Sequence, residues 1–399
     1  MRLTGFTSAF VIALAASSLS VVNADCECGY ITNVGGSKEK TAFAELLESD
    51  FTRADAINSE NNWMVASFNI SKEETHGIYG LNFRPSNVVT FANKKVPLAR
   101  AEIAKPAKLP NQGLELVVSS KLEQDMASVA ELDSRRADLK YGSYRTSMKL
   151  TDMPGTCAAF FWYFNETQEI DMEFLSREFD AHTGLYPVNL IVQSPRAPNA
   201  DYNPQKSGNF IRADLPFNPT TGYHEYRFDF LPGEVYFYAD GKVLAKISGA
   251  AVPEHPGHLI LQHWSNGNSV WSGGPPAKDT SISVRYVKAY FNSTDAARQH
   301  DSNIKCEQAK GKKNAVCEIP DVGTNRSAET FFFSKLGKNQ TLAKTKTKTN
   351  LTNTSLEANH PISSNNKEME EEASAMVWGV PAGLFAMWFT VVSAAVFAL

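Results

Sequence analysis

The sequence predicts an all-β protein whose main domain is a sandwich or barrel of short antiparallel strands. Aromatic and β-branched runs separated by turn residues fill residues 25–297. The stretch "EKTAFAELLES" (39–49) alone has a helical pattern there, and no internal repeat is visible. Many short strands over about 270 residues favour one domain over two.

The individual strands follow from alternation and turn chemistry. Pro232-Gly233 and Asp240-Gly241 are hairpin turn signals between alternating runs. The stretches that we expect to be strands are "GLELVVSSK" (113–121), "SYRTSMKL" (143–150), the hairpins of "HEYRFDFLPGEVYFYADGKVLAKI" (224–247) and "SISVRYVKAYF" (281–291).

One further strand carries the chemistry that we expect. In "EIDMEF" (169–174) acids alternate strictly with apolar residues. The apolar residues would face the core, and Glu169, Asp171 and Glu173 would form one row on the opposite face. Residues two apart on a strand are about 6.6 Å apart in Cα position, so the long Glu side chains can lean toward each other. Their carboxyls could then approach the roughly 5–5.5 Å separation of retaining glycosidases.

Three crowded carboxyls can divide the work of an acid and a nucleophile. Like charges on one face disfavour full ionisation, so at least one pKa should be raised. One Glu can then stay ionised as a nucleophile while the other keeps a proton for the leaving oxygen. The alternative is an ordinary solvent-exposed strand face, because short acidic alternations also arise by chance.

The context of the row favours the catalytic interpretation. Four segments matter here: "YGSYRTSMKLTDMPGTCAAFFWYF" (141–164), "EIDME" (169–173), "YHEYRFDFLPGEVYFYADGKVL" (223–244) and "LQHWSNGNSVWSGGPP" (261–276). In this order they resemble glycoside hydrolase family 16 in its fungal, lichenase-like and cell-wall transglycosylase-like forms. The resemblance covers roughly residues 85–295, whereas residues 25–85 match no part of the family pattern.

The resemblance implies a concanavalin A-like β-jelly-roll sandwich with a concave substrate cleft. It implies Glu169 as nucleophile, Asp171 as assisting carboxylate and Glu173 as acid/base. The implied activity is retaining endo-hydrolysis of cell-wall β-1,3(4)-glucan without a metal or cofactor. Transfer of the cleaved end to glucan or chitin is the alternative, because both outcomes share one glycosyl-enzyme intermediate.

Sugar rings stack on aromatic side chains, which suggests further site residues. Trp162, Trp264 and Trp271 are candidates for substrate binding, and Asn189 is a polar candidate. Core packing explains Trp162 equally well, because large aromatics are often buried. A wall-binding lectin or a structural surface glycoprotein are the non-enzymatic alternatives, but neither needs a row of carboxyls.

The two ends predict an exported, anchored protein. Residues 1–24 have the pattern of a secretory signal peptide. Residues 365–399 have the order of a GPI-attachment signal, with attachment at Ser364 or Asn365, although a spanning helix is the alternative. The polar stretch 298–364 predicts a glycosylated stalk with a possible small disulfide loop.

Composition limits the partners and the bridges. A net charge of −4 gives no argument for nucleic acid, and we expect a monomer. Cys306 and Cys317 could close a loop and Cys157 could bridge to Cys26 or Cys28, but an odd count leaves one thiol over. Candidate N-glycosylation sites start at Asn69, Asn165, Asn292, Asn325, Asn339, Asn350 and Asn353.

Overall fold

The computed structural model describes part of the 399-residue chain. The described residues are 26–53, 57, 62–75, 77–90, 113–194 and 209–336. The predicted signal peptide, the predicted GPI-attachment signal and the C-terminal part of the predicted stalk lie outside them. Within these residues, no helix has the length and apolar character that crossing a membrane requires.

The first of two large sheets has ten strands and follows the order β15-β14-β13-β12-β19-β10-β6-β5, with β4 and β9 also paired to β10. Its pairs are antiparallel except β10 with β6, which is parallel. Its strands are β4 (Trp63–Val65), β5 (Asn69–Ile70), β6 (Gly80–Phe83), β9 (Leu122–Glu123), β10 (Met126–Ser134), β12 (Cys157–Asn165), β13 (Gln168–Leu175), β14 (Pro187–Gln193), β15 (Phe210–Asp214) and β19 (His258–Trp264).

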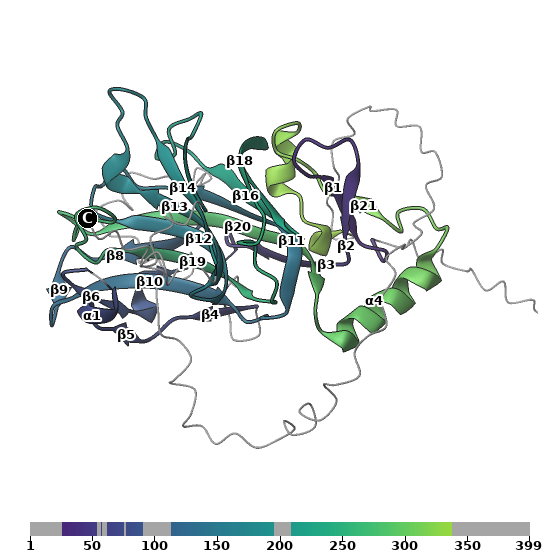
Figure 1. Ribbon diagram of the computed structural model, residues 1–399, viewed down its shortest axis with the longest axis horizontal. Helices are drawn as coiled ribbons and strands as arrows, with labels where there is room; N and C mark the ends of the chain where they lie inside the picture. The colour runs from purple at the N-terminus through teal and green to yellow at the C-terminus, as the bar shows by residue number, and fades with distance from the viewer. Residues whose placement is uncertain are drawn as a thin grey trace, which may run out of the picture.

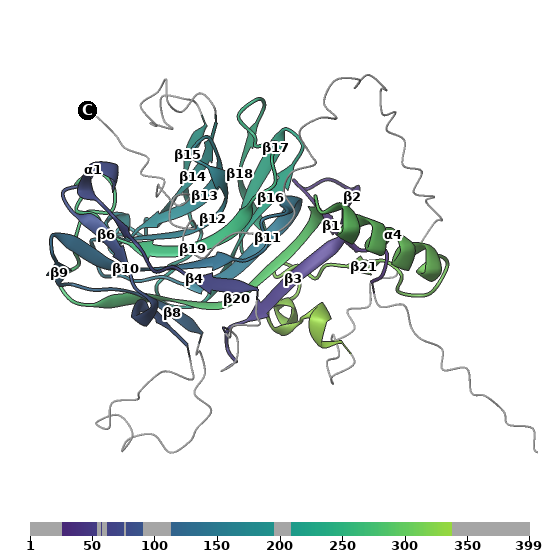
Figure 2. The ribbon, with the colours of Figure 1, turned by 90° about the horizontal axis from the view of Figure 1, so that it is seen from below.

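The second sheet has eight strands in the order β18-β17-β16-β11-β20-β8-β7, with β3 also paired to β20. Its strands are β3 (Glu45–Asp50), β7 (Val88–Val89), β8 (Leu114–Val118), β11 (Leu139–Lys149), β16 (His224–Leu231), β17 (Glu234–Ala239), β18 (Lys242–Ser248) and β20 (Thr280–Ser293). Three short helical turns, α1 (Lys72–Thr75), η1 (Pro85–Asn87) and η3 (Ser176–Glu178), connect strands. Figure 2 shows the two sheets as separate layers.

The main core lies between the two sheets, as the alternation predicts. Ile170, Met172 and Phe174 of β13 contribute to it from one layer, and Phe228 and Phe237 from the other. Burial of such side chains is the main favourable term in folding. The prediction of an all-β sandwich is confirmed, and the strands expected at 113–121, 143–150, 224–247 and 281–291 are present.

The helical interpretation of residues 39–49 is wrong. These residues form β2 (Lys40–Phe43) and most of β3, and Leu47 of β3 lies opposite Ala289 of β20. Phe43 and Leu47 are four residues apart, a spacing that fits either a helix face or one face of two successive strands. Pairing of β3 with the long strand β20 stabilises the extended conformation of these residues over a helix.

A small module joins the two ends of the described chain beside the sandwich (Figure 1). A three-stranded sheet places β1 (Tyr30–Asn33) between β2 and β21 (Cys317–Glu318), with β1 parallel to β21. Helix α4 (Ala296–Ala309) and the turns η5 (Arg326–Thr330) and η6 (Phe333–Lys335) follow the sandwich. Asp295 caps α4 by accepting from the backbone N–H groups of Ala297 and Arg298.

Two disulfides close this module and correct the predicted pairing. Cys26 is bonded to Cys317, and Cys28 is bonded to Cys306. The predicted local loop between Cys306 and Cys317 is therefore wrong, and so is a bridge from Cys157, which is a free, buried thiol. Cys306 and Cys317 each bond to a cysteine near residue 27, because β21 pairs with β1 and brings these two parts of the chain together.

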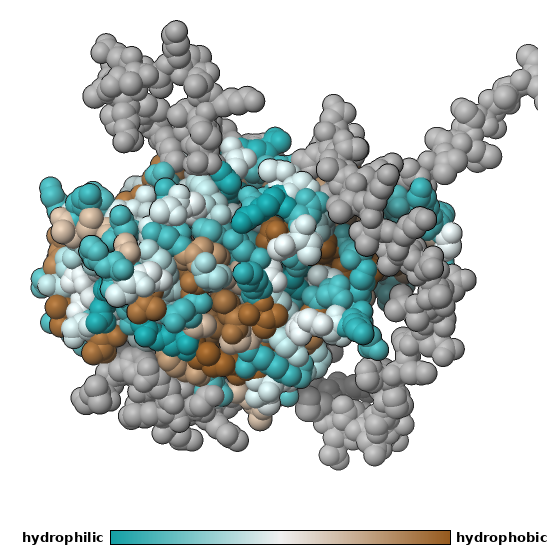
Figure 3. Space-filling model, turned by 90° about the horizontal axis from the view of Figure 1, so that it is seen from above, coloured by the Kyte–Doolittle hydropathy of each residue, from teal (hydrophilic) through white to brown (hydrophobic). Residues whose placement is uncertain are grey.

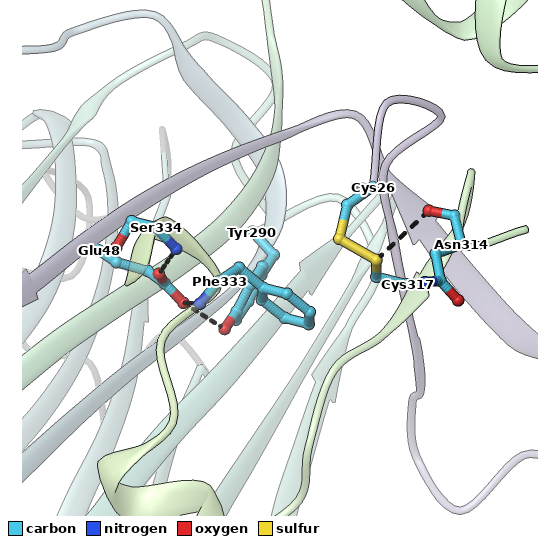
Figure 4. Close-up of a disulfide and its surroundings, with 7 residues drawn as sticks. All are labelled: Cys26, Glu48, Tyr290, Asn314, Cys317, Phe333 and Ser334. Carbon is cyan, nitrogen blue, oxygen red and sulfur yellow. Dashed lines mark hydrogen bonds between the residues drawn. A yellow bond between two sulfur atoms is a disulfide. The ribbon is translucent and has the colours of Figure 1, made fainter. Parts of the chain in front are cut away.

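The described part of the predicted stalk is packed against the second sheet. Figure 4 shows Phe333 beside Tyr290, close to the Cys26–Cys317 bridge. Glu48 accepts hydrogen bonds from the Tyr290 hydroxyl (3.0 Å) and from the backbone N–H groups of Phe333 (3.2 Å) and Ser334 (2.9 Å). Residues 298–336 are therefore part of the folded body, because buried aromatic rings hold a mainly polar segment in place.

Candidate active site

The predicted row of acids lies on β13, on the face turned away from the main core. Glu169 pairs with Tyr163, Asp171 with Phe161 and Glu173 with Ala159 of β12. Because side chains directly opposite in a sheet share a face, these partners belong to the same surface. We call it the carboxylate face; the core-facing residues of β13 belong to the opposite one.

All three acids of the row are buried. Their exposed fractions are 0 % for Glu169, 1 % for Asp171 and 2 % for Glu173. Burial disfavours the charged form of a carboxyl, and neighbouring like charges do the same. The row is therefore no solvated strand face, which was the alternative interpretation of the pattern.

The surroundings raise the pKa values of two of these acids. Burial, the charge of Glu169 and a hydrogen bond with Glu169 raise the pKa of Asp171 well above its usual range. Such a hydrogen bond raises a pKa when the protonated carboxyl is the donor, so Asp171 can donate to a Glu169 carboxylate. Burial and the charge of Glu169 raise the pKa of Glu173 to about 8.

Two donors act against this shift at Glu173. The Cys157 thiol lies 3.6 Å from Glu173 Oε1, and its hydrogen bond and that of the Trp271 side chain lower the pKa of Glu173. The balance leaves a carboxyl that holds its proton at neutral pH. A carboxyl that is still protonated at neutral pH can act as a general acid.

The loop that carries Trp271 packs onto the start of β12. Trp271 is 3 % exposed and clusters with Trp264, Cys157 and Leu175. Arg177 donates to the Trp271 carbonyl oxygen at 3.3 Å. Gly155 has a φ of 105°, and a Cβ there would lie 2.9 Å from the Cα of Gly274, so this close approach requires glycine.

The other predicted binding residues divide between the two faces of the sheet. Asn189 of β14 lies opposite Glu173, and Trp264 of β19 lies opposite Cys157, so both are on the carboxylate face. Trp162 is not: it lies in the main core, and its indole N–H donates to the Leu139 carbonyl oxygen at 3.0 Å. The assignment of Trp162 to substrate binding is corrected, because its place in the β12 alternation turns it inward.

Sequence reasoning missed a fourth carboxyl beside the row. Glu166, in the hairpin between β12 and β13, accepts a hydrogen bond from the Tyr163 hydroxyl at 2.8 Å. Burial and the charge of Glu169 raise the pKa of Glu166 to about 8. The signal was present, because Glu166 is one of the five acids of "NETQEIDMEFLSRE" (165–178).

A second acidic pair lies on the same face, on β10. In register, Glu173 continues through Ala159 and Gln262 to Glu131, and Asp133 follows two residues later. Burial raises the pKa of Glu131 to about 7, opposed by a hydrogen bond from the Gln262 amide. Burial and the charge of Glu131 raise the pKa of Asp133 well above its usual range. The alternation "AELD" (130–133) indicates that the two acids share one face of their strand, but not which face of the sheet that is.

Among the residues that the structure describes, no group of three or more His, Cys, Asp and Glu side chains is arranged to hold a metal ion. The carboxylate face offers acids and hydrogen-bond donors as chemical groups. Together they can supply one ionised carboxylate, one protonated carboxyl and hydrogen bonds that differ between the two.

Known proteins resemble this part of the chain. Residues 101–288 match the family described as glycosyl hydrolases family 16. The beta-glucanases of Paenibacillus macerans and Bacillus amyloliquefaciens are each 31% identical over 140 residues, which are 33% of this chain and 52% of theirs. The solved beta-glucanase of Bacillus licheniformis has a TM-score of 0.45 at 18% identity, covering 61% of this chain and 97% of that one. The chain spans about half the length of the curated relatives it matches.

Proposed function

We propose that the protein is a retaining endo-β-glucanase of glycosyl hydrolases family 16, the family whose model residues 101–288 match, and that it acts on β-1,3(4)-glucan. The observation that carries the proposal is the row on β13. Glu169 and Glu173 share one buried face, and Glu173 has a pKa of about 8. The names of the relatives support glucan as the substrate class.

The first step forms a glycosyl-enzyme ester. The Glu169 carboxylate attacks the anomeric carbon while the bond from that carbon to the glycosidic oxygen breaks. Glu173 transfers its proton to the departing oxygen. A protonated Asp171 can donate to Glu169 and so limit the charge on the nucleophile until the sugar approaches. Because Glu173 keeps its proton below about pH 8, this step is available at neutral pH.

The second step reverses the proton transfer. The Glu173 carboxylate takes a proton from water, the water oxygen attacks the same carbon, and Glu169 leaves as a carboxylate. Two inversions at one carbon give net retention. If a sugar hydroxyl replaces water, the same step joins two chains, which is the transglycosylase alternative. Product analysis on β-glucans of defined linkage, with and without an acceptor oligosaccharide, distinguishes the two.

We place this activity at the cell surface or cell wall. The support is the sequence of the two ends, which has the order of a signal peptide and of a GPI-attachment signal. The substrate proposed, a wall polysaccharide, lies in the same compartment. An anchor would restrict the enzyme to glucan within reach of the membrane.

Azide rescue tests the roles of the two glutamates. With Glu169→Ala, azide should attack an activated glycosyl fluoride directly and give the inverted sugar azide. With Glu173→Ala, azide should intercept the glycosyl-enzyme and give the retained product, because an activated leaving group needs little acid help. Turnover of natural glucan should be lost in both.

Glu178→Ala is the matched control. Glu178 belongs to the same acidic stretch but pairs with Arg212 at 3.2 Å, outside the row. This variant should keep turnover and should not respond to azide. Opposite stereochemistry in the two Glu variants would exchange the roles of Glu169 and Glu173. Wild-type turnover in both would end the proposal.

A further inference from the structure

One buried thiol on the carboxylate face has no part in the mechanism described so far. Cys157 begins β12, is fully buried and lies opposite Leu175 of β13 and Trp264 of β19. The four other cysteines of the chain are bonded to each other. Cys157 therefore remains a thiol, and its single S–H proton is available as a donor.

The thiol has two acceptors within reach, and they differ in charge. Its Sγ lies 3.6 Å from Glu173 Oε1 and 3.7 Å from the carbonyl oxygen of Ala158. One S–H proton serves one acceptor at a time. An ionised carboxylate accepts more strongly than a neutral carbonyl. The thiol should therefore donate to Glu173 when that carboxyl is ionised and be free to donate to Ala158 when it is protonated.

Other groups surround Glu173 on every side of the sheet. Glu169 and Asp171 face it from its own strand and disfavour its charge. From β14 comes the neutral Asn189, and the loop contributes Trp271, a second donor to Glu173. Two cations lie nearby: Arg177 donates to the Trp271 carbonyl oxygen, and Arg212 of β15 lies opposite Asn189. In the other direction along the same register row lies Glu131 of β10. Cys157 is thus one of two donors that oppose the acids.

We propose that Cys157 is a positioning residue for Glu173. The Cys157 thiol donates to Oε1 of Glu173 while that carboxyl is ionised, and the hydrogen bond is released when Glu173 is protonated. The inference rests on the proposed function, in which Glu173 alternates between acid and base. A donor fixed on Oε1 leaves Oε2 for the proton that is exchanged with the glycosidic oxygen and with water. In each turnover the S–H group would then turn twice, from the Ala158 carbonyl oxygen to Glu173 when the proton is given up and back again when it is regained.

The thiol is suited to this role because it stays protonated. Burial and the charge of Glu173 raise the pKa of Cys157 well above its ordinary value. A thiolate would repel the ionised Glu173 and would itself be a nucleophile, whereas the neutral thiol is a weak donor. A weak donor stabilises the carboxylate without removing the proton affinity that the acid role needs.

The test compares two measurements. One is the pH at which activity falls on the alkaline side of the pH–activity profile, called the basic limb, and the other is a direct titration of Glu173. Cys157→Ala and Cys157→Val remove the donor, so both should move the limb upward by roughly 0.5 pH unit. Cys157→Ser supplies a stronger donor and should move it downward. Ile70→Val is the volume control, because it trims a buried side chain of the same apolar cluster on β5, at the opposite end of the sheet order from β13 and β14. It should leave the limb in place.

The second readout does not depend on activity. Carbon-13 labelling of glutamate carboxyls, with Glu173 assigned through Glu173→Gln, gives the pKa of Glu173 in each variant. The proposal is overturned if this pKa is the same in the wild type and in Cys157→Ala, or if Ser and Ala move it in the same direction. If Cys157→Ala does not fold, the pKa of Glu173 is compared between the wild type and Cys157→Val. Thermal unfolding shows whether each variant is folded.

The two readouts separate the two proposals. A moved titration of Glu173 with an equally moved activity limb supports both. A moved titration with an unmoved limb supports the contact between the thiol and the carboxyl but refutes Glu173 as the acid/base, and with it the positioning role in catalysis.

Discussion

Replacing Glu173 with glutamine should stabilise the protein at alkaline pH and not at acidic pH. Glutamine has nearly the shape of glutamate but does not ionise, so the substitution removes a titration rather than a side chain. The pKa of Glu173 rises from an ordinary 4.5 to about 8 in the folded protein, because of burial and the charge of Glu169. The folded state therefore binds this proton more tightly than the unfolded state does.

The sign and the size follow from linkage. Below pH 4.5 both states hold the proton, and Glu173 contributes no pH dependence. Between 4.5 and about 8 the unfolded state loses the proton first, so the free energy of unfolding falls as the pH rises. At 1.36 kcal/mol for each pH unit, the full loss is about 5 kcal/mol, an upper bound because three carboxyls share the repulsion. Above pH 8 the loss levels off.

Urea unfolding at pH 5 and pH 8 measures this contribution. Between these values, the wild type should lose about 2–4 kcal/mol more stability than Glu173→Gln. Glu178→Gln, outside the row, is the charge-matched control and should follow the wild type. Taking the difference between two pH values cancels any constant effect of the amide. Equal losses in the wild type and Glu173→Gln would refute the raised pKa and the buried acid that the mechanism uses.

Two further predictions concern the rest of the molecule. Asp229→Asn should lower the free energy of unfolding by about 1.5–3 kcal/mol, since the buried Arg227 guanidinium loses its bidentate carboxylate and keeps only Asp321 as an ion-pair partner. Glu234→Gln at the exposed Lys246 pair is the control, and equal effects of the two substitutions in denaturant unfolding would contradict the argument. If the C-terminus carries a GPI anchor, a phospholipase specific for that anchor should release the protein from membranes, whereas release by detergent alone, with residues 376–399 still present, would indicate a spanning helix.

The strands of the sandwich were accessible from the sequence because period 2 is a local signal. Alternation in "EIDMEF" (169–174) assigns Met172 inward and Glu173 outward without knowledge of any other strand. The same alternation determines the face of the sheet on which Trp162 lies, but only once the register of β12 against β13 is known. In that register Trp162 lies opposite Ile170. That register belongs to the folded hairpin, so residue type alone led to the wrong face for Trp162.

Features that join distant parts of the chain were not accessible. Glu131 and Asp133 alternate as clearly as the row on β13, but only the strand order places them on the same face. The bridges of Cys26 and Cys28 span 291 and 278 residues, and no local pattern encodes such a separation. The exposed surface carries little signal either: Figure 3 shows hydrophilic and hydrophobic residues interspersed on the face seen from above.

The bridge between Cys26 and Cys317 also sets how the molecule bears mechanical load. A pull applied at residue 26 and at residue 317 is carried across the covalent sulfur–sulfur bond. The 290 residues between them, including every strand of the sandwich and the whole carboxylate face, lie outside that load path. Tension on the chain after residue 336 would first break the contacts of Phe333 and Ser334 with β3 and β20, after which the disulfide would bear it and the carboxyls of β13 would keep their spacing.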